Sequence, residues 1–418
     1  MMKTKTTMKE SVRMGIVALL AAGGISALAK PVVSDVTIAQ RGASRLVEIK
    51  YKLTVEKAIV TLDIQTNGVS IGAANFANAV GDINMVVEPS DDLRTITWQP
   101  VLSWPNQVVG NKGLKAVVKA CTFDDPPDYM VVDLTMKNTI RFYDSVDQVP
   151  GGDTNDIYKT DKMLFSRIPA AGVEWRMGSP TEDSVKELGR NSNEVPHLVK
   201  LSRDYYMAVY ETTCQQWDRI SGSSYTTEAN KLTPFTSPYG SSRGTGWPAS
   251  GHATVGRLAK KLRDKACGFM FDLPTEAEWE FACRGGYGTA LNNGTNLASA
   301  DAASDDNVDL LAVYKDNSGT PAAVANVGTK QKNRWGLYDM HGNFNEWVLD
   351  WYVEDLSTLP TLDPKGGETV DSRVFKGGDF NKAPKNQRSA WRNSRDQWAD
   401  YGGVGTRFCC PVPMDAQD

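Results

Sequence analysis

Hydrophobic and polar residues alternate with a period of two through much of the first 146 residues. Val47, Ile49, Tyr51 and Leu53 alternate with charged residues at 48, 50 and 52. Because successive side chains of a strand point to opposite faces, this pattern predicts a half-buried β-strand. Similar runs, separated by turn residues, lie at 59–64, 95–98, 114–120 and 130–134. Five to seven such strands predict an all-β sandwich of immunoglobulin-like kind over residues 30–146.

Helical spacing appears only in the second part of the chain. Thr275 precedes Glu278 by three residues, which is the capping-box pattern of a helix N-terminus. Two further helices are predicted, one over 253–265 and one over the residues that follow Thr213.

Composition changes along the chain as well. Nine of the eleven tryptophans follow residue 170, and chains with many aromatic residues and few long periodic runs are usually rich in loops. A stretch of turn residues at 150–155, PGGDTN, separates the two parts. The predicted organisation is a signal peptide (1–29), a β-sandwich domain (30–146), a linker (147–162), a second, α+β domain (163–413) and a tail (414–418).

The first 29 residues have the features of a signal peptide. Basic residues at 3, 5, 9 and 13 precede an apolar run over 14–28, and Ala27-Leu28-Ala29 is a suitable cleavage site. The run of about 15 apolar residues is shorter than the ~20 that cross a bilayer, so a retained anchor is the weaker alternative. We expect a secreted, periplasmic or cell-envelope protein that has no membrane span in its mature form.

Charge and cysteine content limit the partners. Cleavage would change the net charge from −4 to −7, because it removes four basic residues and one acidic residue, and such a chain gives no reason to expect nucleic acid as a partner. An exported chain can form disulfides. Cys283 could pair with Cys409 or Cys410, and Cys409 with Cys410, but the sequence leaves the pairing open for Cys214, Cys267, Cys283, Cys409 and Cys410.

Four separated blocks of the second part carry a family resemblance. They are LPTEAEWEFACRGG at 273–286, WGLYDMHGNFNEWVLDW at 335–351, FKGGDFN at 375–381 and GTRF at 405–408. In order and spacing they resemble the sulfatase-modifying factor, or formylglycine-generating enzyme, domain over roughly 163–413. The resemblance implies a C-type-lectin-like α+β fold with little regular structure. It also implies an oxidase that converts a sulfatase cysteine to formylglycine at a copper ion held by two cysteines.

The resemblance further implies a structural calcium ion. The matching positions would bind it through the side chains of Asp339 and Glu346 and the main-chain oxygens of Gly342 and Phe344. Such oxygen ligands suit a hard cation. The alternative for this block is a turn whose acids cap backbone amides in solvent. A second calcium site, for which the acidic segment 301–307 is a candidate, stays open.

The copper cysteines of the resembling enzymes are missing. Lys382 and Gln387 stand at their positions, Asp379 replaces a serine of the family, and Asn345 replaces a tryptophan. Copper(I) selects thiolates, so no copper and no catalytic residue is expected here. The iron-dependent branch of the superfamily is not expected either, because the only histidines, at 197, 252 and 341, lack the spacing of a two-histidine, one-carboxylate site.

The segment that replaces the copper site is rich in amides, guanidinium groups and aromatic rings. This mixture is typical of recognition surfaces, and the candidate ligand-binding residues are Asn381, Lys382, Arg388, Trp391, Arg392 and Trp398. The alternative is a structural loop in which Arg388, Trp391 and Arg392 pack against the domain.

Two functions follow from these observations. The first is an exported, non-oxidising, calcium-stabilised binding or scaffold module that has a glycan or protein ligand, or a partner in the cell envelope. The second is a formylglycine-generating oxidase whose partner is a sulfatase.

Overall fold

The structure is a computed structural model. It describes residues 30–412 apart from 43, 108–112, 183–185, 250, 252, 267, 368–371 and 400–402. The predicted signal peptide, the tail, His252 and Cys267 lie outside the described residues. No helix in the described part of the chain is both long enough and apolar enough to cross a membrane.

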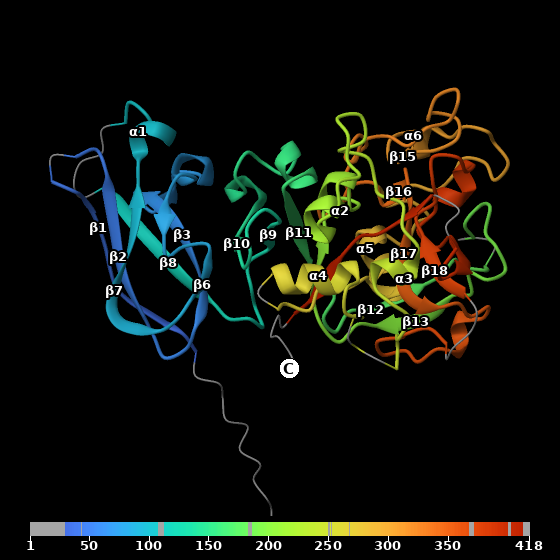
Figure 1. Cartoon of the computed structure of the whole chain (residues 1–418), viewed down its shortest axis with the longest axis horizontal. Helices are drawn as coiled ribbons and strands as arrows, with labels where there is room; N and C mark the ends of the chain where they lie inside the picture. The colour runs from blue at the N-terminus through green and yellow to red at the C-terminus, as the bar shows by residue number, and fades with distance from the viewer. Residues whose placement is uncertain are drawn as a thin grey trace, which may run out of the picture.

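The N-terminal part consists of two antiparallel sheets (Figure 1). One sheet has the order β1-β2-β7-β5, and in the other β3 pairs with β4, β6 and β8. The bounds are β1 (Val32–Gln40), β2 (Val47–Thr54), β7 (Ser90–Trp98), β5 (Val80–Gly81), β4 (Val69–Ser70), β3 (Ala58–Thr66), β6 (Met85–Val87) and β8 (Leu114–Cys121), with the short helices η1 (Ala73–Phe76) and α1 (Pro100–Ser103). Every second residue of β2 is buried, which confirms the predicted alternation. The immunoglobulin-like character of this region stays a prediction.

A five-stranded sheet, in the order β10-β9-β11-β14-β21, begins the second part. Its strands are β10 (Ile140–Tyr143), β9 (Tyr129–Asp133), β11 (Lys162–Ile168), β14 (Tyr205–Ala208) and β21 (Cys409–Pro411). Because β9 pairs with β11, the change of sheet lies between β8 and β9 and not at residue 146, where the sequence placed it. Alternation identifies a strand but does not show which sheet the strand joins.

The predicted linker is also part of the packed structure. It contains the end of η2 (Val146–Gln148) and all of η3 (Asp156–Lys159), and the Tyr158 side chain is buried in a core cluster with Val149. The Tyr158 hydroxyl donates a hydrogen bond of 2.8 Å to the carbonyl of Pro150. Residues 147–162 therefore connect β10 to β11, two strands of the same sheet, as a compact turn region.

A four-stranded sheet, β19-β18-β17-β20, lies beside the helices (Figure 1). Its strands are β17 (Asn345–Trp351), β18 (Ser372–Lys376), β19 (Arg392–Asp396) and β20 (Val404–Gly405). Short ladders join β12 (Glu174–Met177) to β13 (His197–Lys200) and β15 (Ala312–Val313) to β16 (His341–Gly342). The remaining helical elements are α2 (Cys214–Ser221), α3 (Tyr239–Ser242), α4 (Leu258–Lys265), α5 (Glu276–Arg284), α6 (Asp306–Asp309), η4 (Leu356–Thr358) and η5 (Pro384–Gln387). The second part is thus α+β and rich in loops, as expected.

Two of the three predicted helices begin where the sequence placed them. α5 follows Thr275, whose hydroxyl accepts from the Glu278 N–H in a complete capping box, and α2 follows Thr213. The third helix, α4, begins at Leu258 and not at 253. Gly256 has φ +82°, a left-handed conformation that a continuing right-handed helix does not contain, so the predicted first turn is absent.

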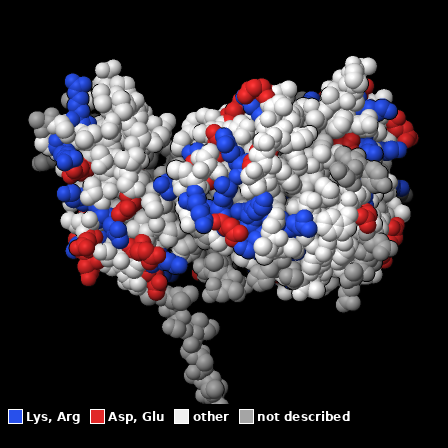
Figure 2. All heavy atoms as spheres, in the orientation of Figure 1, with Lys and Arg blue, Asp and Glu red and all other residues white. Residues whose placement is uncertain are grey.

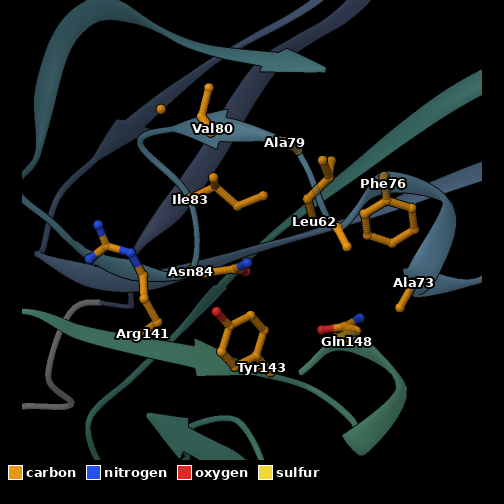
Figure 3. A pocket seen from close by; sticks show the side chains of 12 residues that line it. Leu62, Ala73, Phe76, Ala79, Val80, Ile83, Asn84, Arg141, Tyr143 and Gln148 are labelled. Atoms are coloured by element: carbon orange, nitrogen blue, oxygen red, sulfur yellow. The ribbon is translucent and has the colours of Figure 1, made fainter. Parts of the chain in front are cut away.

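The two parts meet along β3, β6 and β10. The Phe142 N–H donates to the Asn84 carbonyl at 2.9 Å. A cavity of about 140 Å³ opens beside this contact, with Leu62, Phe76 and Ile83 on one side and Arg141 and Tyr143 on the other (Figure 3). It is smaller than the roughly 300 Å³ at which pockets for drug-sized ligands begin.

Charges on the visible face are mixed. Lysine and arginine side chains gather in the middle of the molecule, where Figure 1 shows α4 (Figure 2). Several basic side chains of this region are paired with nearby acids, in Lys260–Asp264, Arg219–Asp161 and Lys162–Asp133. The first two pairs are largely exposed, and such pairs contribute little to stability.

Candidate functional site

The segment after β18 contains the two positions that the sequence resemblance assigns to the copper cysteines of the oxidases, Lys382 and Gln387. Two glycines with positive φ, Gly377 and Gly378, end the strand and let the chain approach η5 closely. A Cβ atom at Gly378 would overlap the Gln387 side chain. Lys382 is exposed, whereas Gln387 is completely buried. The two positions therefore have different environments as well as different side chains.

The Gln387 amide links the ends of this segment. Its Nε2 atom donates to the carbonyls of Asp379 and Ala383 at 3.3 Å and of Lys382 at 3.4 Å. The main-chain carbonyl of Gln387 accepts a hydrogen bond of 2.5 Å from His341 Nδ1. The Gln387 side chain therefore fills the interior of the segment and forms only long hydrogen bonds there. Neither of the two positions carries a sulfur ligand.

The other two departures from the family contact each other. Asn345 Nδ2 donates to Asp379 Oδ2 at 2.6 Å and to the Gly403 carbonyl at 3.0 Å. The second carboxylate oxygen of Asp379 accepts from the Asn381 N–H at 2.8 Å. Asn345 and Asp379 therefore form one hydrogen-bonded unit where the resembling oxidases have a tryptophan and a serine.

A buried cysteine and histidine lie behind this segment, a neighbourhood that the sequence analysis missed. Cys283 Sγ lies 4.0 Å from His341 Nε2 and 3.4 Å from Ser389 Oγ. Burial raises the pKa of Cys283 to about 12 and lowers the pKa of His341 to about 4. Both groups are therefore neutral at pH 7, so the pair is not an activated thiolate.

The predicted calcium residues lie in and around the turn between β16 and β17: Asp339 precedes β16, Gly342 ends it, Phe344 lies in the turn and Glu346 belongs to β17. Asp339 Oδ2 accepts from the Gly328 N–H at 2.5 Å, and the Gly342 carbonyl accepts from the Phe344 N–H at 2.8 Å. Asp339 and Glu346 are 2% and 1% exposed, so the alternative of a solvated acidic turn is wrong.

Glu346 already has a cationic partner. Arg407 lies against both of its carboxylate oxygens, with contacts of 2.7 to 3.0 Å, and Trp279 Nε1 donates to it at 2.6 Å. This pairing explains the GTRF block, because the arginine between β20 and β21 neutralises an acid of β17. It also means that a calcium ion would share Glu346 with a guanidinium group.

Glu211 adds a third acid that sequence reasoning missed. Asn343 Nδ2 donates to its Oε2 atom at 2.7 Å, but its buried Oε1 atom has no partner. Burial, followed by the charges of Asp339 and Glu346, raises the pKa of Glu211 well above its usual value. A signal was present, because Glu211 ends the otherwise hydrophobic run 205–210.

Asp339 is also a buried acid with a raised pKa. Burial raises the pKa of Asp339 to about 6, and Glu346 adds to the effect while Arg407 opposes it. In the described part of the chain, no group of three or more His, Cys, Asp or Glu side chains is arranged to hold a metal ion. The predicted set consists of two carboxylates and two main-chain carbonyls, and calcium binding there stays a prediction.

Three of the six predicted ligand-binding residues are core residues. Arg388, Trp391 and Arg392 are at most 3% exposed, which contradicts a role in binding and agrees with the structural alternative. Arg388 pairs with Glu194 at 2.6 Å. Arg392 pairs with Glu276 at 2.7 Å. These ion pairs hold the segment after β18 against α5 and the 187–194 loop.

The other three predicted residues remain accessible. Asn381 and Lys382 are exposed, and Trp398 is 50% exposed. The Trp398 ring packs over Gly240, and the Arg257 guanidinium lies 5.5 Å from its centre. The candidate ligand surface is therefore smaller than the sequence suggested.

The cysteines that the structure describes are all free: Cys121, Cys214, Cys283, Cys409 and Cys410. The considered bridges between Cys283 and the last strand, and between Cys409 and Cys410, are absent. Cys409 and Cys410 face different core clusters because adjacent strand residues point to opposite sides of a sheet.

Comparison with known proteins agrees with the four sequence blocks. Residues 174–410, more than half of the chain, match the sulfatase-modifying factor enzyme 1-like domain. The chain therefore belongs to this family.

Individual relatives match over shorter stretches. The formylglycine-generating enzyme of Mus musculus is 36% identical over 110 residues, which are 26% of this chain and 30% of that protein. The formylglycine-generating enzyme of Thermomonospora curvata is 36% identical over 114 residues, or 26% and 38% of the two chains. The serine/threonine-protein kinase Pkn1 of Chlamydia trachomatis is 29% identical over 160 residues, or 37% and 24%. The chain thus spans about a third of the length of the curated relatives it matches.

Among solved structures, Treponema denticola variable protein 1 is similar with a TM-score of 0.45 and 22% identity, over 60% of this chain and 95% of that chain. PvdO from Pseudomonas aeruginosa has a TM-score of 0.45 and 19% identity, over 60% and 94%.

Proposed function

We propose that this protein is an exported member of the sulfatase-modifying factor family that acts as a calcium-stabilised, lectin-like binding or envelope scaffold module and has no copper oxidase activity. The observation that carries the proposal is the presence of Lys382 and Gln387 where the family's oxidases have copper cysteines. An ammonium group or a carboxamide cannot replace a thiolate on copper(I).

Internal hydrogen bonding supports this interpretation. The Gln387 amide is bonded to three carbonyls of its own segment, and Asp379 is bonded to Asn345. These side chains thus stabilise the segment itself. A protein can keep the fold of its family and lose the family's activity when the reacting side chains are replaced.

The alternative is a formylglycine-generating oxidase that acts on a sulfatase. Its support is the similarity to the formylglycine-generating enzymes of Mus musculus and Thermomonospora curvata. It requires a thiolate pair elsewhere in the chain. Cys409 and Cys410 are poor candidates, because burial raises the pKa of Cys410 to about 12 and that of Cys409 well above its usual value.

The partner of the proposed module is a glycan or protein ligand, or another component of the cell envelope. The accessible residues of the predicted surface, Asn381, Lys382 and Trp398, combine an amide, a cation and an aromatic ring. Aromatic rings supply contact area and amides supply adaptable hydrogen bonds. Calcium would be bound by Asp339, Gly342, Phe344 and Glu346, and would supply structural stability to the β16–β17 turn.

A peptide oxidation assay tests the proposal. The purified chain, supplied with copper(I) and oxygen, is incubated with a peptide that contains the motif C-x-P-x-R, and mass spectrometry measures conversion of the cysteine to formylglycine. We expect no conversion above the level seen without protein. A curated formylglycine-generating enzyme run in parallel is the positive control, and copper-dependent turnover by this chain would refute the proposal.

A further inference from the structure

A second cavity lies at the opposite end of β17 from Asn345 and Asp379. It has a volume of about 330 Å³, which is within the range of small-molecule sites. Leu349 lines it, four residues after Asn345 in the same strand, so strand geometry separates the two positions by about 13 Å. This cavity is therefore distinct from the segment that replaces the copper site.

The floor of the cavity is apolar, and the buried carboxylate beside it is paired with arginines of the protein. Leu273 and Leu349 line it and are 0% and 4% exposed. Asp272, also part of the lining, accepts from Arg263 at 2.7 Å and from Arg243 at 3.1 Å. The floor can therefore take an apolar group, and Asp272 is not available to bind a cation.

The other two acids of the lining also have protein donors. Glu278 Oε2 accepts from the Thr275 N–H at 2.8 Å as part of the capping box of α5. Asp363 Oδ1 accepts from the Ser202 N–H at 2.8 Å. These contacts hold each carboxylate against the backbone.

Two basic residues of the lining lack such partners. Arg203 and Lys365 are exposed, and within the described part of the chain neither forms a salt bridge or a side-chain hydrogen bond. Lys365 Nζ lies 5.7 Å from the centre of the Trp247 ring, which also lines the cavity. Arg203 lies near enough to Glu278 for its charge to lower the pKa of that carboxyl, although burial raises it more.

We propose that this cavity binds a small molecule that has an apolar body and one anionic group, such as an aryl carboxylate or an aryl sulfonate. The apolar body packs on Leu273 and Leu349 beside the Trp247 ring. Arg203 and Lys365 bind the anionic group through charge-assisted hydrogen bonds. This binding does not depend on the loss of the copper cysteines, so it holds or fails separately from the proposed function.

Fluorescence titration with 1-anilinonaphthalene-8-sulfonate tests the proposal, because this probe joins aromatic rings to one sulfonate. We expect one saturable site per chain. The double substitution Arg203→Ala and Lys365→Ala should weaken binding at least tenfold, and the neutral probe N-phenyl-1-naphthylamine should bind the two proteins equally. Met270→Trp, which fills the cavity from its partly buried wall, should abolish saturable binding of both probes.

A matched control uses solvent-accessible cations of the same domain that lie outside the cavity. The double substitution Arg176→Ala and Lys231→Ala removes the same charge and should leave the sulfonate affinity unchanged. Thermal unfolding of each variant checks that the fold is kept. Absence of saturable binding to the unsubstituted chain would overturn the proposal, as would sulfonate affinity that is unchanged in the Arg203→Ala and Lys365→Ala protein or in a folded Met270→Trp protein.

Discussion

At the scale of single residues, buried ion pairs fix the segment that replaces the copper site. Arg388, Arg392 and Lys376 are completely or almost completely buried, and each contacts a buried glutamate. The glutamate that pairs with Arg388 lies 194 positions away in the sequence. Residue types alone therefore gave Arg388 and Arg392 two possible roles, surface recognition or packing, and only tertiary contacts could decide between them.

Removal of the Arg388 charge should be strongly destabilising. The substitution Arg388→Met leaves Glu194 buried without a guanidinium partner and Glu187 with Arg284 alone, and loss of one member of a buried pair typically costs about 3–5 kcal/mol. Urea unfolding should show this as a lower midpoint. Arg176→Met, which removes an exposed pair with Glu182, is the matched control and should change stability by less than about 1 kcal/mol. Equal midpoints for the two variants would show that the buried pairs do not stabilise the segment.

At the scale of elements, local signals were the most reliable. The capping box at Thr275 predicted the start of α5 because both of its hydrogen bonds are formed within four residues. The period-two pattern predicted β2 because this pattern, too, depends only on residues that are close together in the sequence. The predicted start of α4 was wrong because Gly256 adopts a left-handed conformation inside a sequence pattern that looks helical. The β16–β17 turn was predicted from the family resemblance, whereas Glu211 beside it was missed because it lies far away in the sequence, in the loop between β14 and α2.

Calcium should stabilise the β16–β17 turn. An ion that binds only the folded state at 100 times its Kd adds about 2.7 kcal/mol, which raises the Tm by roughly 5–10 °C for a domain of ordinary size. We expect a chelator to lower the Tm of the unsubstituted chain and to have no effect on Asp339→Ala. Asp316→Ala, at an exposed acid, should keep the chelator effect. A Tm of the unsubstituted chain that is unaffected by chelator would contradict calcium binding at this turn.

At the scale of the whole molecule, the family and the α+β character of the second part could be predicted, but the boundary between the two parts could not. The four sequence blocks lie in α5, in the β16–β17 region, at the end of β18 and between β20 and β21, and they correspond to the buried centre of the second part. Strands β9 and β10 precede all four blocks and follow directly on the β-rich N-terminal part. β10 pairs with β9, and β9 pairs with β11; the second pairing is a long-range property, which a run of hydrophobic residues does not encode.

Truncation tests the observed boundary. A chain that starts at residue 122 keeps β9 and β10 and should unfold cooperatively. A chain that starts at residue 147, just after the predicted boundary, exposes the β11 edge and the side chains that Met130 and Val132 cover, so it should aggregate or lack a cooperative transition. Circular dichroism during heating and size-exclusion chromatography measure both. Equal cooperativity of the two chains would show that β9 and β10 are dispensable for the second part.

The measurement that tests the central claim most directly is a copper(I) titration of the purified chain in competition with a chromophoric chelator. We predict that the unsubstituted chain takes no copper(I) from the chelator, because Lys382 and Gln387 offer no thiolate. The double substitution Lys382→Cys and Gln387→Cys, which restores the family's ligand pair, should bind one equivalent. Stoichiometric, high-affinity copper(I) binding by the unsubstituted chain would contradict the account.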